Sequence, residues 1–449
     1  MAKQNPKFQF IDLFAGVGGF HAALSALGGE CVYAVEIDSK AAEVYRRNWG
    51  IDPLGDITQD ANDEVMNVPP HNVLAAGFPC QPFSKSGAQK GMDEARGTLY
   101  WNILKIIQTH KPEVVLLENV RNLAGPRHRH EWQIIIETLR DEGYRVSETP
   151  AIFSPHLLPP ERGGRPQVRE RVFITATHNP DNIGEGLPVL PVATNTKAVG
   201  GWDSKDDWDL YEILDREFVV PGCELSESET LWIDAWDEFV EIMWERREGR
   251  RLPGFPIWAD SWKHYREPIP VGTPAWKASH LTKNYDFYAA HRKVLDDWAE
   301  KWGVFTDAFP ASRRKLEWQA QDTPRLWDTV MHFRPSGIRA KRPTYLPALV
   351  AITQTSIVGP LKRRLSPRET ARLQGLPDSF DFGDQKPSAT YKQMGNGVNV
   401  GAVYHVLRAH VNRDEEILKH TELGRAILDA VRETPDSPDE HLSHHIPRG

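Results

Sequence analysis

One of the three cysteines, Cys80, is the strongest candidate for chemistry in this chain. It lies just beyond the apolar run Val73–Ala76, in a turn that Pro79 and Pro82 stiffen on either side. A free thiol has a pKa near ~8.5, so a nucleophilic role requires nearby cations or helix-end amides that stabilise the thiolate. Without them Cys80 would be an ordinary small buried residue. The sequence therefore predicts a nucleophile only if other reactive groups converge on it.

A carboxyl group and two guanidinium groups are candidates for that convergence. Glu118 ends the apolar run Val114–Leu117, where an acid is costly to bury unless it is paired or protonated. A raised pKa would let Glu118 donate a proton. Arg169 and Arg171 are expected to alternate onto one face of an extended segment, with Glu170 on the other. They could hold a polar substrate atom and a phosphate, or form only a structural ion pair with Glu118.

A glycine-rich turn, Asp12–Phe20, follows the first apolar run and opens the first predicted helix. Ligands bind at such strand ends in α/β sheets, and glycines let them approach the backbone closely. The spacing is neither G-x-G-x-x-G nor a P-loop, so a bound phosphate is not indicated. Glu36, at the next strand end, could accept from ribose hydroxyls. Asp56, after what could be a third strand end, could accept from an exocyclic amine while Ile57 packs on an adenine face.

Each of those acids alone could be a solvent-facing loop residue. Together with the glycine turn they predict a nucleoside cofactor that lacks phosphate charge. We predict no metal site.

Alternating strand and helix signals over the first ~175 residues must position these groups. The expected strands are Phe8–Phe14, Cys31–Val35, Asn72–Ala76, Val114–Leu117 and Arg171–Thr175, and the expected helices are Gly19–Leu27, Leu99–Thr109 and Glu131–Glu142. Repeated βα units predict an α/β domain with a mostly parallel sheet covered on both faces.

Two regions of different composition and periodicity follow the alternating region. Residues 181–363 hold twelve of the fifteen tryptophans and little clean periodicity, which predicts a smaller, irregular α+β region. Near Leu365, Ser366 is expected to cap a helix with Pro367 at N1 and Glu369 at N3. A further helix is expected to run to Val406. The charged tail begins near residue 413, and its last dozen residues are expected to fray. The expected parts are thus 1–180, 181–363, 364–412 and 413–449.

Composition limits where in the cell this protein is expected and which partners it is expected to bind. Three cysteines are too few for a disulfide framework, and we find no signal peptide and no apolar run of ~18 residues. We therefore expect a soluble, cytoplasmic and nucleoid-associated protein without a membrane partner. The net charge of −8 argues mildly against a nucleic-acid partner. However, Phe333–Gln374 carries nine Lys or Arg residues and one acid, which favours a local basic surface.

The ordered set of these segments resembles the cytosine-C5 DNA methyltransferase family of the bacterial restriction–modification type. The resemblance covers about residues 8–180 and 360–410, and its specificity comes from the complete order. The matching segments are Asp12–Phe20, Glu36, Gly55–Ile57, Gly77–Ser84, Arg96–Leu99, Glu118–Val120, Gln167–Arg171, Arg364–Glu369, Gln374–Phe380 and Gln393–Val398.

The resemblance implies a seven-stranded Rossmann-like sheet, S-adenosylmethionine as cofactor and a flipped-out cytosine as substrate. Cys80 would add covalently to C6 of that base while its C5 takes the methyl group. Glu118 would be the partner of N3, and Arg171 would hold O2 with support from Arg169. The residues implied at the cofactor are Phe14, Ala15, Gly16, Gly18, Gly19, Glu36, Ile37, Asp56, Ile57, Pro79, Leu99, Asn396 and Val398.

The same resemblance makes 181–363 the target-recognition region and 81–96 a loop that closes over DNA. Gly87 and Gly91 would serve that loop as hinges, and Ser86 would fill the gap left by the flipped base. The tryptophans of the insert are more typical of core packing than of base contact. Arg334–Pro343 looks like a DNA-contacting loop, whose arginines could reach guanine or phosphate. The residues implied at DNA are Ser84, Ser86, Gln89, Arg334, Arg339, Lys341 and Arg342.

Two alternative functions stay open at this point. A tRNA cytosine-C5 methyltransferase is disfavoured by the insert of about 180 residues and by the Gln81–Ser84 continuation. A catalytically inactive DNA-binding homologue is disfavoured by the intact Cys80, Glu118 and Arg171. The expected partners are double-stranded DNA and a cognate restriction endonuclease or other defence-system proteins. We expect a monomer.

Overall fold

The computed structural model describes residues 7–79, 98–192, 201–217, 219–320, 322–351 and 355–445. The chain divides into two compact units. The first unit comprises Met1–Trp208, Pro347–Thr353 and Thr370–Gly449, and the second comprises Asp209–Leu346 and Gln354–Glu369. The second unit is therefore inserted into the sequence of the first.

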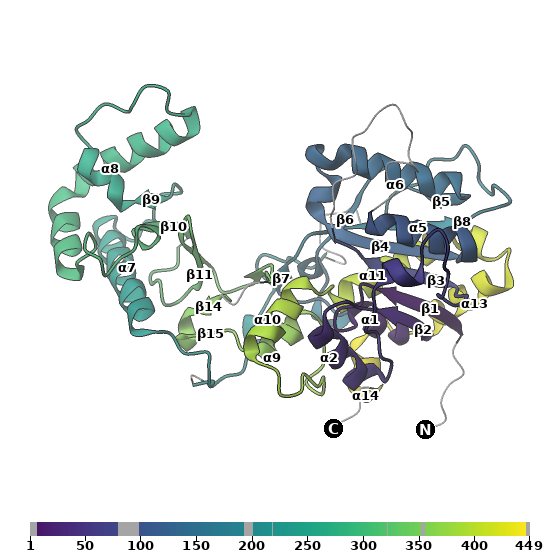
Figure 1. The fold of residues 1–449 in the computed structure, drawn as a ribbon. Helices are drawn as coiled ribbons and strands as arrows, with labels where there is room; N and C mark the ends of the chain where they lie inside the picture. The colour runs from purple at the N-terminus through teal and green to yellow at the C-terminus, as the bar shows by residue number, and fades with distance from the viewer. Residues whose placement is uncertain are drawn as a thin grey trace. The chain divides into compact units, whose positions relative to one another are not determined.

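The first unit is built on a sheet that has seven strands within the described ranges (Figure 1). Its order is β2-β1-β3-β4-β8-β5, and β6 also pairs with β8. The strands are β1 (Phe8–Leu13), β2 (Gly29–Val35), β3 (Val73–Gly77), β4 (Val114–Val120), β5 (Tyr144–Val146), β6 (Ala151–Phe153) and β8 (Arg171–His178). The five strands expected from apolar runs are all present, with slightly different ends.

The sheet is mixed, because six of its seven described strands run in one direction and β8 runs in the opposite one. β2, β1, β3 and β4 run parallel, whereas β8 is antiparallel to β4, β5 and β6. Antiparallel neighbours need no crossover helix, so the short β5 and β6 can lie beside β8 without one. In the described range 51–56, the structure has no strand of the kind suggested before Asp56. A single bridge joins Glu36 to Leu54, next to Pro53, which has no N–H to extend a ladder.

Helices cover both faces of this sheet, as expected for strands that are apolar on both sides (Figure 1). One face packs on α1 (Gly19–Ala26), α2 (Ser39–Trp49), α11 (Val400–Arg413) and α13 (Glu422–Glu433). The other face packs on α3 (Ile57–Asp60), α5 (Leu99–His110) and α6 (Arg129–Asp141). Side chains alternate between the two cores along each strand, as in Val114 and Leu116 against Val115 and Leu117.

The C-terminal part is more ordered than the sequence suggested. The capping box at α9 (Pro367–Leu373) is confirmed, since Ser366 Oγ accepts from Glu369 N at 3.1 Å and Glu369 Oε2 accepts from Ser366 N at 2.7 Å. The expected fraying is wrong for 439–445, which form α14 (Asp439–His445) and bury Leu442 in the core. The remaining helices here are α10 (Pro387–Asn396) and α12 (Glu415–Leu418).

The second unit packs two long helices, α7 (Glu227–Arg246) and α8 (Ala275–Trp302), with a sheet of order β15-β14-β11-β12-β10-β9. Its strands are β9 (Ile257–Trp258), β10 (Lys315–Gln319), β11 (Val330–Arg334), β12 (Gly337–Lys341), β14 (Ile357–Val358) and β15 (Arg363–Arg364). Trp236, Trp262, Trp298 and Trp318 are buried in its core, which confirms a packing role for these tryptophans. Among the helices described in either unit, none is both long and apolar enough to span a membrane.

Candidate active site

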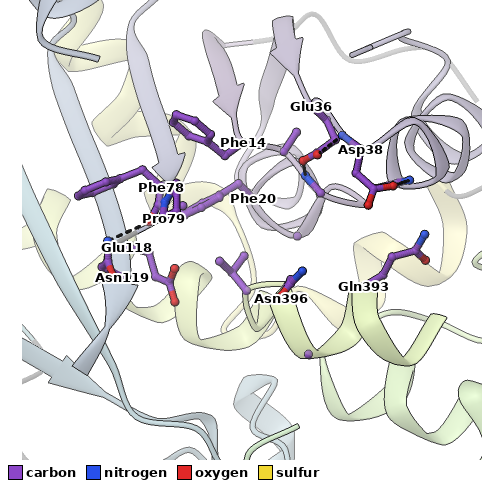
Figure 2. A pocket seen from close by; sticks show the side chains of 18 of the residues that line it. Phe14, Phe20, Glu36, Asp38, Phe78, Pro79, Glu118, Asn119, Gln393 and Asn396 are labelled. Carbon is purple, nitrogen blue, oxygen red and sulfur yellow. Dashed lines mark hydrogen bonds between the residues drawn. The ribbon is translucent and has the colours of Figure 1, made fainter. Parts of the chain in front are cut away.

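A cavity of about 430 Å³ opens at the carboxyl ends of β1 to β4 (Figure 2). Its volume falls within the range of roughly 300–1,000 Å³ that is typical of small-molecule sites. The lining residues are Phe14, Ala15, Gly16, Gly19, Phe20, Glu36, Asp38, Ala41, Gly77, Phe78, Pro79, Glu118, Asn119, Val120, Arg171, Lys392, Gln393, Gly395, Asn396, Gly397 and Val398. Figure 2 shows Glu36 and Asp38 at one end of this cavity and Glu118 and Asn119 at the other.

The turn after β1 has two glycines that serve different purposes. Both have positive φ, +56° at Gly16 and +95° at Gly18, where a side chain would be strained. A Cβ on Gly18 would lie 2.1 Å from Nε1 of Trp49, so this glycine lets the turn pack on the indole ring. A Cβ on Gly16 would meet no atom within 4 Å, and Gly16 borders the cavity. Among the described residues, the space beside Gly16 is therefore open.

Glu36 holds this turn in place from the end of β2. Its Oε2 accepts a hydrogen bond from Gly16 N at 2.8 Å, and its Oε1 accepts one from Asp38 N at 2.7 Å. Both carboxylate oxygens thus bind backbone, while the side chain still lines the cavity. Each oxygen has a second lone pair with which it can accept from a ligand hydroxyl.

Glu118 and Arg171 form an ion pair at the opposite end. Arg171 Nε lies 3.0 Å from Glu118 Oε1, and Glu118 is buried at 7% exposure. Burial raises the pKa of the Glu118 carboxyl above its usual value, although the charges of Arg171 and Arg169 oppose the shift. Within the part of the chain that the structure describes, Oε1 accepts no hydrogen bond of good geometry. Burial thus favours the protonated form of this carboxyl, whereas the two arginines favour its charged form.

Asn119 is a site residue that the sequence reasoning missed. Its Nδ2 donates to the carbonyl of Phe78 at 2.8 Å, and its Oδ1 accepts from Val120 N at 2.8 Å. It therefore ties the end of β4 to the backbone that leads from β3 towards Cys80. An amide directly after the candidate acid was the only sequence signal for it.

Arg169 does not share a face with Arg171. β7 (Gln167–Val168) ends before Arg169 and β8 begins at Arg171, so the strand alternation expected across this segment is wrong. Arg169 is 1% exposed and is absent from the cavity lining. It donates instead to the carbonyls of Leu349, Gly395 and Gly397 at 3.0, 2.9 and 2.6 Å.

The residues predicted at the cofactor divide into two groups. Eight border the cavity, namely Phe14, Ala15, Gly16, Gly19, Glu36, Pro79, Asn396 and Val398. Gly18, Ile37, Asp56, Ile57 and Leu99 do not. Asp56 caps α3 by accepting from Thr58 N at 2.9 Å, Ile57 is buried in the core and Ile37 is 73% exposed. Cys80, Ser84, Ser86, Gln89 and the hinges Gly87 and Gly91 lie outside the described residues.

Some of the residues that line the cavity were not among the cofactor residues predicted from the sequence, although Asn396 and Val398 beside them were. Lys392 and Gln393 of α10 line the cavity, and Lys392 Nζ lies 3.0 Å from Asp38 Oδ2. Phe20 contributes from α1. α10 begins with Pro387, the residue favoured at N1, which could have signalled this helix.

The predicted DNA-contacting loop in the second unit is mostly a β-hairpin. β11 and β12 pair antiparallel and only Pro335 and Ser336 connect them, so the expectation of a loop is wrong for most of Arg334–Pro343. Pairing places His332, Arg334, Arg339 and Lys341 on one face, whereas the alternate residues point into the core. Arg339 pairs with Glu317 at 2.7 Å. Burial lowers the pKa of His332 to about 4, and the nearby arginines contribute to the shift.

The first unit is thus an α/β domain with a cavity at its strand ends and a buried carboxyl that borders this cavity. The profile of the C-5 cytosine-specific DNA methylase family matches residues 8–412. The type II methyltransferase M.AluI of Cellulosimicrobium cellulans is 56% identical, over 98% of this chain and 98% of its own length. M.HhaI of Haemophilus parahaemolyticus is 43% identical, over 90% and 94%.

The chain belongs to the C-5 cytosine-specific DNA methylase family and is a DNA cytosine-C5 methyltransferase. M.HpaII of Haemophilus parainfluenzae, also named a type II methyltransferase, is 38% identical over 88% of this chain and 87% of its own length. These similarities give no support to a tRNA methyltransferase or to an inactive DNA-binding homologue.

Proposed function

We propose that the cavity binds S-adenosylmethionine and that the enzyme methylates C5 of a flipped-out cytosine within a specific DNA sequence. The cavity volume, the space beside Gly16 and the rings of Phe14, Phe20 and Phe78 suit an adenosyl group. Glu36 would accept from the ribose hydroxyls. Asp56 uses only Oδ1 in the cap of α3 as far as the described residues show, so Oδ2 could accept from the adenine amine.

The reaction would use Cys80 as nucleophile and Glu118 as acid. The cofactor, when bound, supplies a methyl group on a sulfonium. The Cys80 thiolate would add to C6 of cytosine while Glu118 donates its proton to N3, so the electron pair of the C5–C6 double bond collects at C5. After methylation, loss of the C5 proton to a base would restore the double bond and expel the thiolate. N3 would then return its proton to Glu118.

Arg171 would orient the cytosine through its O2. Its Nη2 makes no hydrogen bond in the described residues, whereas Nη1 donates to the carbonyl of Glu170 at 3.0 Å and Nε faces Glu118. A guanidinium beside a neutral carboxyl also stabilises negative charge that develops on the base. The single observation that carries the proposal is this buried acid–arginine pair at one end of a nucleoside-sized cavity.

The second unit would recognise the target sequence through the basic face of the β11–β12 hairpin. Arg334, Arg339, Lys341 and Arg342 would contact phosphates or base edges. The three relatives named above are type II methyltransferases. By analogy, the biological role would be protection of host DNA beside a cognate restriction endonuclease or within another defence system.

The test is methyl transfer from tritiated S-adenosylmethionine to plasmid DNA, with bisulfite sequencing of the product. We expect 5-methylcytosine at one short sequence. Cys80→Ser should abolish methylation, and Cys223→Ala is the control for a cysteine of the second unit. Label that appears only in tRNA, or a Cys80→Ser variant that still methylates DNA, would contradict the proposal.

A further inference from the structure

The C-terminal end of α10 forms one wall of the cavity, and it is an unusual wall. Gly395, Asn396, Gly397 and Val398 all line the cavity, so the ligand would face the last turn of a helix. The last carbonyls of a helix have no intrahelical N–H partner, and the helix dipole concentrates negative charge there. This wall therefore needs external donors to keep one conformation.

Close packing fixes the position of the wall, but packing alone gives its carbonyl groups no hydrogen-bond donors. A Cβ on Gly395 would lie 2.3 Å from the carbonyl carbon of Val350, so the helix end touches that backbone directly. A Cβ on Gly19 would lie 2.7 Å from Val398 Cγ2, so the other side of the turn rests on α1. Small displacements of this turn would change the shape of the cavity at both contacts.

We propose that Arg169 is a positioning residue for the cofactor, because its guanidinium caps the C-terminus of α10 and holds the Gly395–Val398 wall. Nη2 donates to the carbonyls of Gly395 and Gly397, and Nη1 donates to Leu349 on the neighbouring segment. The positive charge of Arg169 also interacts favourably with the negative end of the helix dipole. Gln374 Nε2 donates to Gly397 at 3.3 Å and thus supports the same turn from another side.

This role differs from direct support of the substrate base. Arg169 does not border the cavity, so it acts on the ligand only through the wall. Lysine could keep the charge but not the function, because a single ammonium cannot reproduce the planar fork that spans two segments. The inference rests on the proposed cofactor, and binding must therefore be measured apart from turnover.

The experiment compares Arg169→Lys with wild type for binding of S-adenosylhomocysteine by calorimetry and for kcat at saturating cofactor. We expect the Kd of the probe and the KM of the cofactor to rise about tenfold or more, the order expected when charge-assisted hydrogen bonds are lost. We expect kcat to change less than about threefold. If wild type itself fails to bind the probe, the proposed cofactor is wrong, which is a separate outcome.

The matched control is Arg165→Lys. Arg165 Nε donates to the carbonyl of Arg372 at 2.9 Å in the same unit, but neither residue borders the cavity. We expect this variant to lose thermal stability without a change in Kd. Equal loss of Tm in both variants with unchanged Kd would overturn the inference.

If Arg169→Lys does not fold, the same binding measurement is made on Gln374→Ala. A Kd raised several-fold would support the role of the wall, and an unchanged Kd would overturn it.

Discussion

Arg171 Nε lies 3.0 Å from Glu118 Oε1, yet that oxygen accepts no well-formed hydrogen bond in the described part of the chain. The two groups thus form a buried ion pair at hydrogen-bonding distance without a well-aligned hydrogen bond. Because burial raises the pKa of Glu118 and Arg171 lowers it, the pair sets how readily this acid gives up its proton. The proposed reaction depends on that balance.

The first prediction concerns the pH dependence of kcat. Arg171→Met removes the largest charge that lowers the pKa of Glu118, so this pKa should rise further, and the charge of Arg169 is the other one that still lowers it. Because the protonated acid is the active form, the alkaline limb of the kcat profile should move to higher pH. Single-turnover methylation between pH 6 and 10 measures it. In Glu118→Gln that limb should be absent, with kcat about 10²-fold lower or more. A limb that moves to lower pH would contradict the assigned acid.

The second prediction concerns Glu36 and the glycine turn. Glu36→Gln keeps one acceptor but turns an NH₂ group towards a backbone N–H, since both carboxylate oxygens accept from the backbone. The KM for the cofactor should rise about tenfold or more, with a smaller effect on kcat. Steady-state kinetics measure this effect. Glu30→Gln, at an exposed position of the same strand, should leave both constants unchanged. Equal effects of the two substitutions would contradict the prediction.

The third prediction separates the two glycines after β1. Gly18→Ala should lower the Tm strongly, because its Cβ would overlap the Trp49 indole at 2.1 Å. Gly16→Ala meets no atom, so it should cost only the strain of a positive φ, about 1–2 kcal/mol. However, its methyl group would enter the cavity and weaken cofactor binding. Calorimetric unfolding and binding measure the two effects. The prediction fails if Gly16→Ala binds the cofactor as wild type does.

The fourth prediction concerns the basic hairpin and DNA. Arg334 and Lys341 make no ion pair in the described residues, whereas Arg339 is paired with Glu317. If Arg334 and Lys341 contact phosphates, Arg334→Ala and Lys341→Ala should each reduce the slope of log K against log salt by about 0.9. Fluorescence anisotropy with a duplex over a salt series measures this slope. Lys277→Ala, exposed on α8, is the control and should leave it unchanged. Unchanged slopes in both hairpin variants would exclude phosphate contact.

Much of the first unit could be predicted from the sequence, because its strands and helix caps depend on residues that are close together in the chain. The strands of Phe8–Leu13 and Val114–Val120 are continuous apolar runs, and the Ser366–Glu369 capping box is a contact within one turn. The direction of each strand relative to its neighbours was harder to predict, because the same apolar run can pair with a parallel or an antiparallel neighbour. The strand before Asp56 was overestimated, and Asp56 instead caps α3.

The ordered motifs by themselves determined that this chain belongs with the cytosine-C5 methyltransferases, since residue types and their order need no coordinates. Only the tertiary structure decided what each polar side chain contacts. Arg169 and Arg171 are two residues apart, yet one binds carbonyls more than 220 positions away and the other faces Glu118. The physical reason is that a buried guanidinium must find acceptors wherever packing brings them, and this packing joins segments that are distant in the sequence.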